Sequence, residues 1–132
     1  MSHDQPRGKV LVVDDEPDLT RILEFGLQSA GFLVECAADG QEGLKKAREG
    51  KPDMILLDLM LPKLDGYKVC RLLKFDERYK HIPIIILSAR TQEGDQALAL
   101  EMGANLFVTK PYDFSEILGH IDSLLKSPTA RS

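Results

Sequence analysis

Polar side chains capable of metal or phosphate chemistry stand at or just after short apolar runs of this sequence. Three carry a carboxylate, one a hydroxyl and one an ammonium: Asp14, Asp15, Asp58, Ser88 and Lys110. If the apolar runs are parallel strands of one sheet, their carboxyl ends meet at one edge, where open α/β sheets bind ligands. Carboxylates held close together repel one another. A hard divalent cation relieves that repulsion, and oxygen ligands suit Mg²⁺ or Mn²⁺.

A phosphoryl group fits such a pocket. Lys110 would add a second positive charge opposite the metal, so the pocket favours extra negative charge beside Asp58. Phosphoryl transfer needs little from a protein beyond positioning and charge neutralisation, and a carboxylate can accept the group as an aspartyl phosphate. Each residue alone has a simpler reading as a helix cap, a turn residue or a surface charge. Their joint position at one sheet edge favours the chemical reading.

The elements that must position these side chains alternate between strand and helix five times. The predicted strands are 9–13, 32–37, 54–57, 83–87 and 106–108. The predicted helices follow them, at 17–30, 41–49, 67–75, 92–102 and 114–125. Acidic caps and Pro17 in the first turn predict the start of the first helix, and Gly31 predicts its end.

The fold class follows from the absence of polar alternation in the strands. Such strands are buried on both faces, which predicts a parallel sheet covered by helices on both sides. We therefore expect an α/β protein, a single flavodoxin-like doubly wound domain of five β–α units with a five-stranded parallel sheet. The expected domain spans 9–126, with an N-terminal tail at 1–8 and a C-terminal tail at 127–132. That length leaves no room for an output module, so we expect none.

Composition argues against several classes of protein, among them nucleic-acid-binding, membrane and secreted proteins. The 132 residues carry a net charge of −4, which argues against direct nucleic-acid binding, and 43% are hydrophobic. No apolar run approaches the roughly 20 residues of a membrane helix, and the start lacks a signal-peptide pattern, so we expect a cytoplasmic protein without a membrane segment. Cys36 and Cys70 are interpreted as free thiols, and the scattered His3, His81 and His120 do not indicate a metal cluster.

At this point the sequence resembles the receiver domains of two-component response regulators, especially stand-alone, chemotaxis-regulator-like members. The resemblance covers about residues 9–125. It rests on four motifs in combination: the acidic pair Asp14-Asp15, the segment from Asp58 through Pro62 to Gly66, the pair Ser88-Ala89 and the pair Lys110-Pro111, whose peptide bond is typically cis in this family.

The resemblance implies roles for the polar residues. Asp58 would be the phosphoacceptor, and Lys110 and the Ser88 hydroxyl would contact phosphate oxygens. Asp15, Asp58 and the backbone carbonyl of Met60 would bind Mg²⁺ directly, whereas Asp14 would act through a metal-bound water. The phosphoryl donor would be a phosphohistidine on a sensor histidine kinase or a histidine phosphotransfer protein. The chain would catalyse only its own phosphorylation and dephosphorylation.

The resemblance also implies a switch. Phe107 stands where the family places an aromatic residue that turns inward when the hydroxyl, here Ser88, moves toward the phosphate. Phe lacks the hydroxyl of the commoner Tyr, and the alternative is a simple core residue. Ala89, Arg90 and Met60 would lie beside the phosphate.

An output surface is implied as well. The face of the fourth helix, fifth strand and fifth helix, around Ala97, Glu101, Phe107 and Tyr112, would bind a separate output protein. The chain would be a monomer or a phosphorylation-dependent dimer.

Three other functions are weighed against this one. A haloacid-dehalogenase-type phosphatase needs a second acid two residues after the nucleophile, where Met60 stands and cannot donate a proton. A flavodoxin-like electron carrier would hold a flavin phosphate after the first strand, where Asp14 and Asp15 would repel it. A degenerate receiver that serves only for docking is disfavoured by the full set of polar residues.

Overall fold

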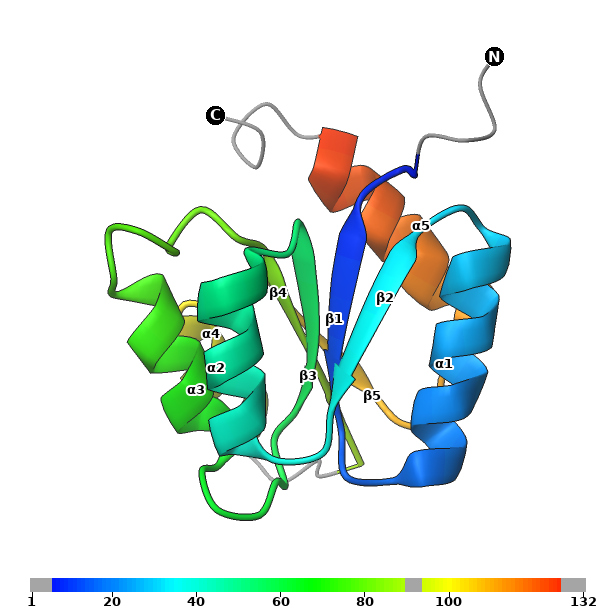
Figure 1. Ribbon diagram of the computed structural model, residues 1–132. Coiled ribbons are helices and arrows are strands. Elements are labelled where there is room, and N and C mark those ends of the chain that lie inside the picture. Colours follow the sequence, from blue (N-terminus) through cyan, green and yellow to red (C-terminus); the bar gives the residue numbers. More distant parts are fainter. Residues whose placement is uncertain (1–5, 90–93, 127–132) are drawn as a thin grey trace.

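The computed structural model describes residues 6–89 and 94–126. Five parallel strands form one sheet in the order β2-β1-β3-β4-β5, with five helices around it (Figure 1). The strands are β1 Lys9–Val13, β2 Leu33–Ala37, β3 Met54–Asp58, β4 Ile84–Ser88 and β5 Leu106–Thr109. The helices are α1 Pro17–Ser29, α2 Gly40–Gly50, α3 Gly66–Lys74, α4 Asp95–Glu101 and α5 Phe114–Lys126. The α/β prediction is confirmed, and this strand order is that of the flavodoxin-like class.

Two apolar clusters, one on each face of the sheet, hold the helices in place. The side chains of α1 and α5 that enter the first cluster include Leu23 and Ile117, which are 1% and 0% exposed. The helices α2, α3 and α4 pack on the opposite face, where Ala47, Leu73 and Ala99 are buried. The strands β1, β3 and β4 supply both clusters, because their alternate side chains point to opposite faces. This explains why their sequences lack polar alternation.

The helix ends differ in detail from the sequence predictions. Glu16 is the N-cap of α1 but makes no side-chain capping bond, so the predicted acidic cap is wrong in that respect, although Pro17 does begin the helix. The helix α2 extends one residue beyond the predicted range at each end, and Lys51 takes the left-handed conformation that ends it. The described part of α4 begins at Asp95, and the predicted start near Gln92 falls outside the described residues.

Arg7, which the sequence predictions assign to the N-terminal tail, packs against the domain. Its backbone N–H donates to the carbonyl of Gly31 at 2.8 Å. Its guanidinium lies 4.6 Å from the ring centre of Phe32 and forms an ion pair with Asp122 of α5. The segment before β1 thus contacts both the turn after α1 and the last helix.

Candidate functional site

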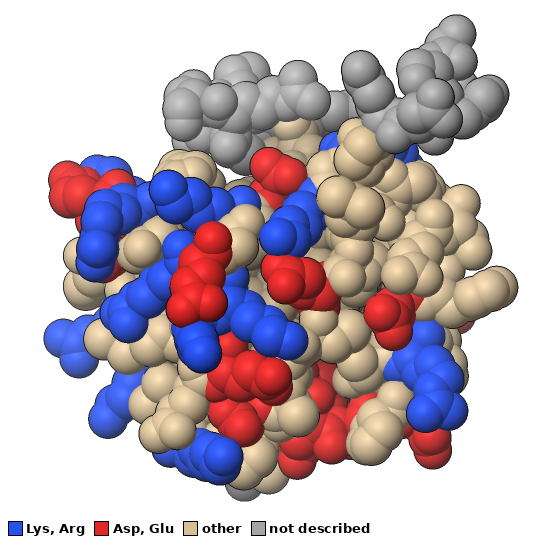
Figure 2. Space-filling view, in the orientation of Figure 1, with Lys and Arg blue, Asp and Glu red and all other residues tan. Residues whose placement is uncertain are grey.

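The carboxyl ends of the strands meet at one edge of the sheet, at the bottom of Figure 1. Asp14 directly follows β1, Asp58 is the last residue of β3, and Ser88 is the last residue of β4. Strand register brings these positions level, because Asp58 pairs with Leu87 and Ser88 pairs with Thr109 of β5. Acidic side chains gather at this end of the molecule (Figure 2). The predicted convergence at one edge is therefore found.

Lys110 is the centre of the polar contacts at this edge. Its Nζ donates to Asp58 Oδ2 at 2.8 Å and to Asp14 Oδ2 at 3.0 Å. A third contact, of 3.1 Å, reaches Glu16 Oε1. The backbone positions the lysine, since its N–H donates to the carbonyl of Ser88 at 2.8 Å and its peptide bond to Pro111 is cis, as the resemblance implies. One ammonium thus bridges the carboxylates at the carboxyl ends of β1 and β3.

Two of these carboxylates are almost completely removed from solvent. Asp14 is 4% exposed and Asp58 is 6% exposed. Burial raises the pKa of Asp14 above its ordinary value, although its hydrogen bonds to Glu16 and Lys110 act in the opposite direction. Burial would also lower the pKa of Lys110, but the hydrogen bonds that its ammonium donates to Asp58 and Asp14 outweigh this effect and raise the pKa. The site therefore stabilises the charged form of Lys110, whereas burial destabilises the ionised form of Asp14.

Backbone groups orient the two buried carboxylates. The N–H of Met60 donates to Asp58 Oδ1 at 3.0 Å, and the N–H of Glu16 donates to Asp14 Oδ1 at 2.9 Å. Each aspartate thus has one oxygen bound to its own turn and the other bound to Lys110. The segment after Asp58 is tightly packed: a Cβ added to Gly66 would lie 2.4 Å from the Asp58 carbonyl oxygen. Glycine is needed here for the close approach of two backbone segments.

The structure groups the acidic residues differently from the sequence prediction. Among the described residues, carboxylate oxygens of Asp14, Glu16 and Asp58 lie within 4.8 Å of one another, whereas the Asp15 side chain is exposed and does not join this group. Sequence reasoning did not select Glu16 as a site residue. Its only signal was its place between the acidic pair and Pro17, where a helix N-cap was expected. We call Asp14, Glu16, Asp58 and Lys110 the acidic cluster.

The predicted switch and phosphate-adjacent residues occupy distinct environments. Ser88 is fully buried, and the Phe107 ring is half-buried against the cluster under α2, α3 and α4. Ala89 is exposed and Met60 is 61% exposed. Arg90 lies outside the described residues.

The Tyr112 hydroxyl and the two cysteine thiols were not predicted to take part in the chemistry of the site. Tyr112 follows the cis peptide, and its buried hydroxyl has no hydrogen-bond partner among the described residues. Burial raises the pKa of Tyr112 to about 12. Both cysteines are free, as predicted, with Cys70 buried and Cys36 half-buried.

The donor set fits a hard divalent cation. Carboxylate oxygens of three residues lie close enough together to share one ion. Such oxygens are the ligands that Mg²⁺ takes in proteins, and Lys110 supplies the balancing positive charge in the structure as it stands.

The fold and the site together define a flavodoxin-like α/β protein with a buried acidic cluster at the ligand-binding edge of its sheet. The family model of the response regulator receiver domain matches residues 10–122. The chain therefore belongs to the receiver domain family of two-component signal transduction. Receiver domains are phosphorylation-dependent signalling switches that bind Mg²⁺ at an acidic pocket, and they are not generally classed as enzymes.

Relatives of known identity agree with this family. The alkaline phosphatase synthesis transcriptional regulatory protein PhoP of Bacillus subtilis is 43% identical over 118 residues, which are 89% of this chain and 48% of PhoP. The chain thus spans about half the length of this curated relative.

Two solved structures have the same fold. The receiver domain of the sensor histidine kinase PA1611 from Pseudomonas aeruginosa PAO1 is 32% identical, with a TM-score of 0.84 over 91% of this chain and 98% of that one. The chemotaxis response regulator CheY4 of Vibrio cholerae is 31% identical, with a TM-score of 0.81 over 87% and 96% of the two chains. Within the described residues, no helix of this chain is long and apolar enough to cross a membrane.

Proposed function

We propose that Asp58 is the phosphoacceptor of this receiver domain and that Lys110 and Ser88 stabilise the phosphoryl group on it. The observation that carries the proposal is the contact of 2.8 Å between Lys110 Nζ and Asp58 Oδ2 inside a buried acidic cluster. A phosphoryl group on that oxygen would place its charge beside an ammonium that Asp58 and Asp14 already hold in the site. Electrostatic stabilisation of this kind is the main protein contribution to phosphoryl transfer.

The residues around Asp58 have separate tasks in the reaction. Asp58 Oδ2 attacks the phosphorus of a phosphohistidine, the bond from phosphorus to the imidazole nitrogen breaks, and the imidazole leaves with its electron pair. The Met60 N–H holds the other carboxylate oxygen at 3.0 Å, which fixes the direction of attack. Lys110 follows the incoming charge to the phosphoryl oxygens, and Ser88 donates its hydroxyl to one of them. Met60 offers no side-chain acid, so a phosphomonoesterase reaction is disfavoured.

The acidic cluster would hold Mg²⁺ or Mn²⁺. The family resemblance assigns the ion to Asp15, Asp58 and the Met60 carbonyl, with Asp14 acting through a water. The proximity of Asp14, Glu16 and Asp58 oxygens supports a cation site here and adds Glu16 as a candidate ligand. When bound, the ion neutralises negative charge that develops on the transferred group. The receiver domain of PA1611, a relative, carries a coordinated magnesium ion in its active-site cleft.

The partners follow from the family. A sensor histidine kinase or a histidine phosphotransfer protein would donate the phosphoryl group. We assign the output surface to α4, β5 and α5, around Ala97, Glu101, Phe107 and Tyr112, with Ser88 and Phe107 coupling it to Asp58. The half-buried position of Phe107 supports this coupling, because an inward turn of the ring would bury apolar surface that is now exposed. We further propose a cytoplasmic domain of residues 9–126 that does not itself bind nucleic acid and is a monomer or a phosphorylation-dependent dimer.

The test of the phosphoacceptor is labelling by acetyl phosphate, followed by intact-protein mass spectrometry. The wild type is expected to gain one phosphoryl group in the presence of Mg²⁺ and none in EDTA. Asp58→Asn should gain none. Asp18→Asn, which changes an exposed acidic residue in the first turn of α1, is the matched control and should be labelled normally. Undiminished labelling of Asp58→Asn would refute the proposal.

The metal ligands are tested by comparing Asp15→Asn with Glu16→Gln in calorimetric titrations with Mg²⁺. If the resemblance identifies the ligand, Asp15→Asn weakens binding strongly, because an ionised oxygen ligand is lost, and Glu16→Gln changes it little. The reverse result would assign the role to Glu16. Unchanged Mg²⁺ affinity in both variants and in Asp58→Asn would contradict a cation site in the acidic cluster.

A further inference from the structure

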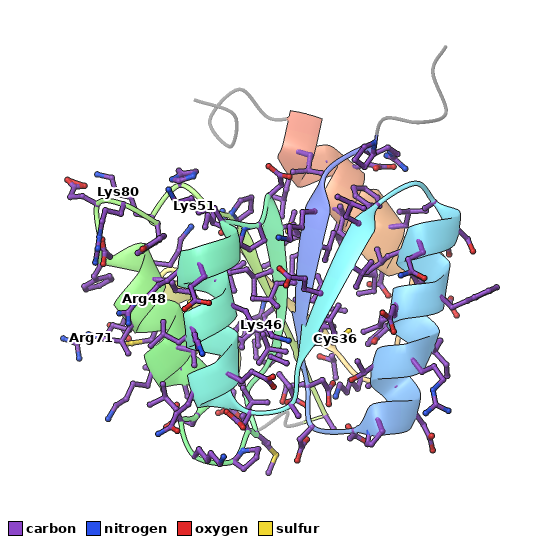
Figure 3. The ribbon with its side chains drawn as sticks, in the orientation of Figure 1. Cys36, Lys46, Arg48, Lys51, Arg71 and Lys80 are labelled. Carbon is purple, nitrogen blue, oxygen red and sulfur yellow. The ribbon has the colours of Figure 1, made fainter. Side chains whose placement is uncertain are left out.

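A groove of about 1050 Å³ runs beside α3 and shares no residue with the acidic cluster. We call it the α2–α3 groove. Its lining combines cationic and apolar side chains, among them Arg48 from α2 and Arg71, Leu72 and Phe75 from α3 and its end. In Figure 3, Arg48 lies between α2 and α3, and Arg71 points outward from α3. The groove is therefore open to a partner.

This face is basic although the whole chain carries a net charge of −4. Lys and Arg side chains spread over α2 and α3 in Figure 2. Several of them make no ion pair with any described residue: Lys45, Arg48, Lys51, Lys68 and Arg71. Three acidic residues line the groove. Asp76 binds Arg78 at 2.9 Å and Glu77 binds Lys80 at 2.5 Å, whereas the Asp65 side chain accepts the backbone N–H of Lys68 at the start of α3. Among the described residues, the cationic side chains without an ion pair on this surface therefore outnumber the one groove-lining carboxylate without an ion pair, Asp65.

The groove also exposes apolar surface. The Phe75 side chain is 67% exposed and Leu72 is 40% exposed. The Arg71 guanidinium lies over the Phe75 ring, 5.7 Å from its centre. An aromatic residue with an arginine beside it is the composition that protein interfaces favour at their energetic centres. The contact also holds the arginine where it can meet a carboxylate.

Arg48 supplies an independent observation. Its Nε atom is buried, yet no described residue accepts a hydrogen bond from it. A buried N–H without an acceptor is costly, and the cost is larger for a charged group. Asp76 lies near enough for Arg48 to lower the pKa of its carboxyl, after the larger effects of Arg78, but it is committed to Arg78. A carboxylate entering the groove would supply the missing acceptor.

We propose that the α2–α3 groove docks an acidic, amphipathic segment of a partner protein. Carboxylates of that segment would bind Arg48 and Arg71, and its apolar side chains would cover Leu72 and Phe75. A nucleic acid fits less well, because protein surfaces that bind it are strongly positive and polar, whereas this groove is apolar at Leu72 and Phe75. Docking here does not depend on phosphorylation of Asp58.

The test is a titration of the ¹⁵N-labelled full chain, followed by NMR, with a synthetic amphipathic peptide of Glu and Leu. Two other probes are a peptide of the same composition with the Leu spacing scrambled, and a single-stranded oligonucleotide. We expect the amphipathic peptide to shift amides of α2 and α3 and to bind more tightly than either other probe. Asp58→Asn should bind it as the wild type does.

Matched variants separate the groove from general surface charge. Arg71→Glu and Phe75→Ala should each weaken peptide binding about tenfold, which corresponds to about 1.4 kcal/mol. Arg21→Glu and Phe25→Ala, which change exposed residues of α1, should leave the affinity unchanged. Arg71 and Phe75 are exposed, so the amide spectrum verifies that these variants fold.

The proposal would be overturned by any of four results. The first two are that the amphipathic peptide does not bind and that the scrambled peptide binds equally well. The other two are that the oligonucleotide binds more tightly than the amphipathic peptide and that neither groove variant changes the affinity for that peptide.

Discussion

Replacing Lys110 by Met removes the ammonium from the acidic cluster while keeping a side chain of similar length. Lys110 Nζ lies 2.8 Å from Asp58 and 3.0 Å from Asp14, whose side chains are 7% and 3% exposed. The third contact, to Glu16, involves a side chain that is 61% exposed, so solvent screens it and it contributes little. The cost of the substitution therefore arises from the two buried aspartates.

The expected loss of unfolding free energy follows from the repulsion between the carboxylates, which the ammonium no longer offsets in Lys110→Met. The oxygens of the clustered carboxylates lie within 4.8 Å of one another. At an effective dielectric constant of about 20, two unit charges at that separation repel by about 3.5 kcal/mol. Protonating one ordinary carboxyl at pH 7 costs about 4 kcal/mol, so proton uptake limits the penalty to at most about that value. We expect Lys110→Met to lose about 3 kcal/mol of unfolding free energy.

The assay is urea unfolding monitored by far-ultraviolet circular dichroism, in EDTA at pH 7.5 and pH 5 and in Mg²⁺ at pH 7.5. Burial already raises the pKa of Asp14, and loss of the ammonium raises it further. The folded variant then binds a proton more tightly than the unfolded chain does, so its stability rises as the pH falls through that raised pKa. The deficit should shrink at pH 5. It should also shrink in Mg²⁺, because the ion replaces the lost positive charge and so stabilises the native variant more than the native wild type.

The matched control is Lys80→Met, which breaks the ion pair with Glu77 between side chains that are 56% and 81% exposed. This substitution should lower the unfolding free energy by less than about 1 kcal/mol, and Mg²⁺ should not change that loss. The electrostatic reasoning fails if Lys110→Met is as stable as the wild type in EDTA. It also fails if the deficit is the same at both pH values and with Mg²⁺.

Four further predictions concern packing and burial. Gly66→Ala would bring a Cβ to 2.4 Å from the Asp58 carbonyl, so we expect a loss of about 1–3 kcal/mol in urea unfolding. Gly119→Ala in α5 meets nothing within 4 Å and should gain about 0.5–1 kcal/mol; equal effects would contradict the packing argument. Burial raises the pKa of Cys70 to about 11, so mass spectrometry should find it alkylated at pH 8 only after unfolding in urea. Tyr112→Phe removes a buried hydroxyl without a partner among the described residues and should raise Tm through about 1 kcal/mol of stabilisation; a lower Tm would indicate that the hydroxyl has a partner.

Much of this protein could be predicted from local sequence. Apolar strands such as Met54–Asp58 and helices such as Pro17–Ser29 have different periods, and both periods are readable without tertiary information. The sheet edge that carries Asp14, Asp58, Ser88 and Lys110 was predictable for a general reason. Parallel strands place their carboxyl ends together whatever their order.

The tertiary structure decided the details on which the chemistry depends. Whether Asp15 or Glu16 approaches Asp58 depends on side-chain directions at the turn into α1, and neighbouring residues in a sequence carry no such information. The contacts of Lys110 join residues at the carboxyl ends of β5, β1 and β3, which requires the strand order β2-β1-β3-β4-β5. The α2–α3 groove arises in the same way, because Arg48 and Phe75 line one surface only after two helices pack on the same face of the sheet.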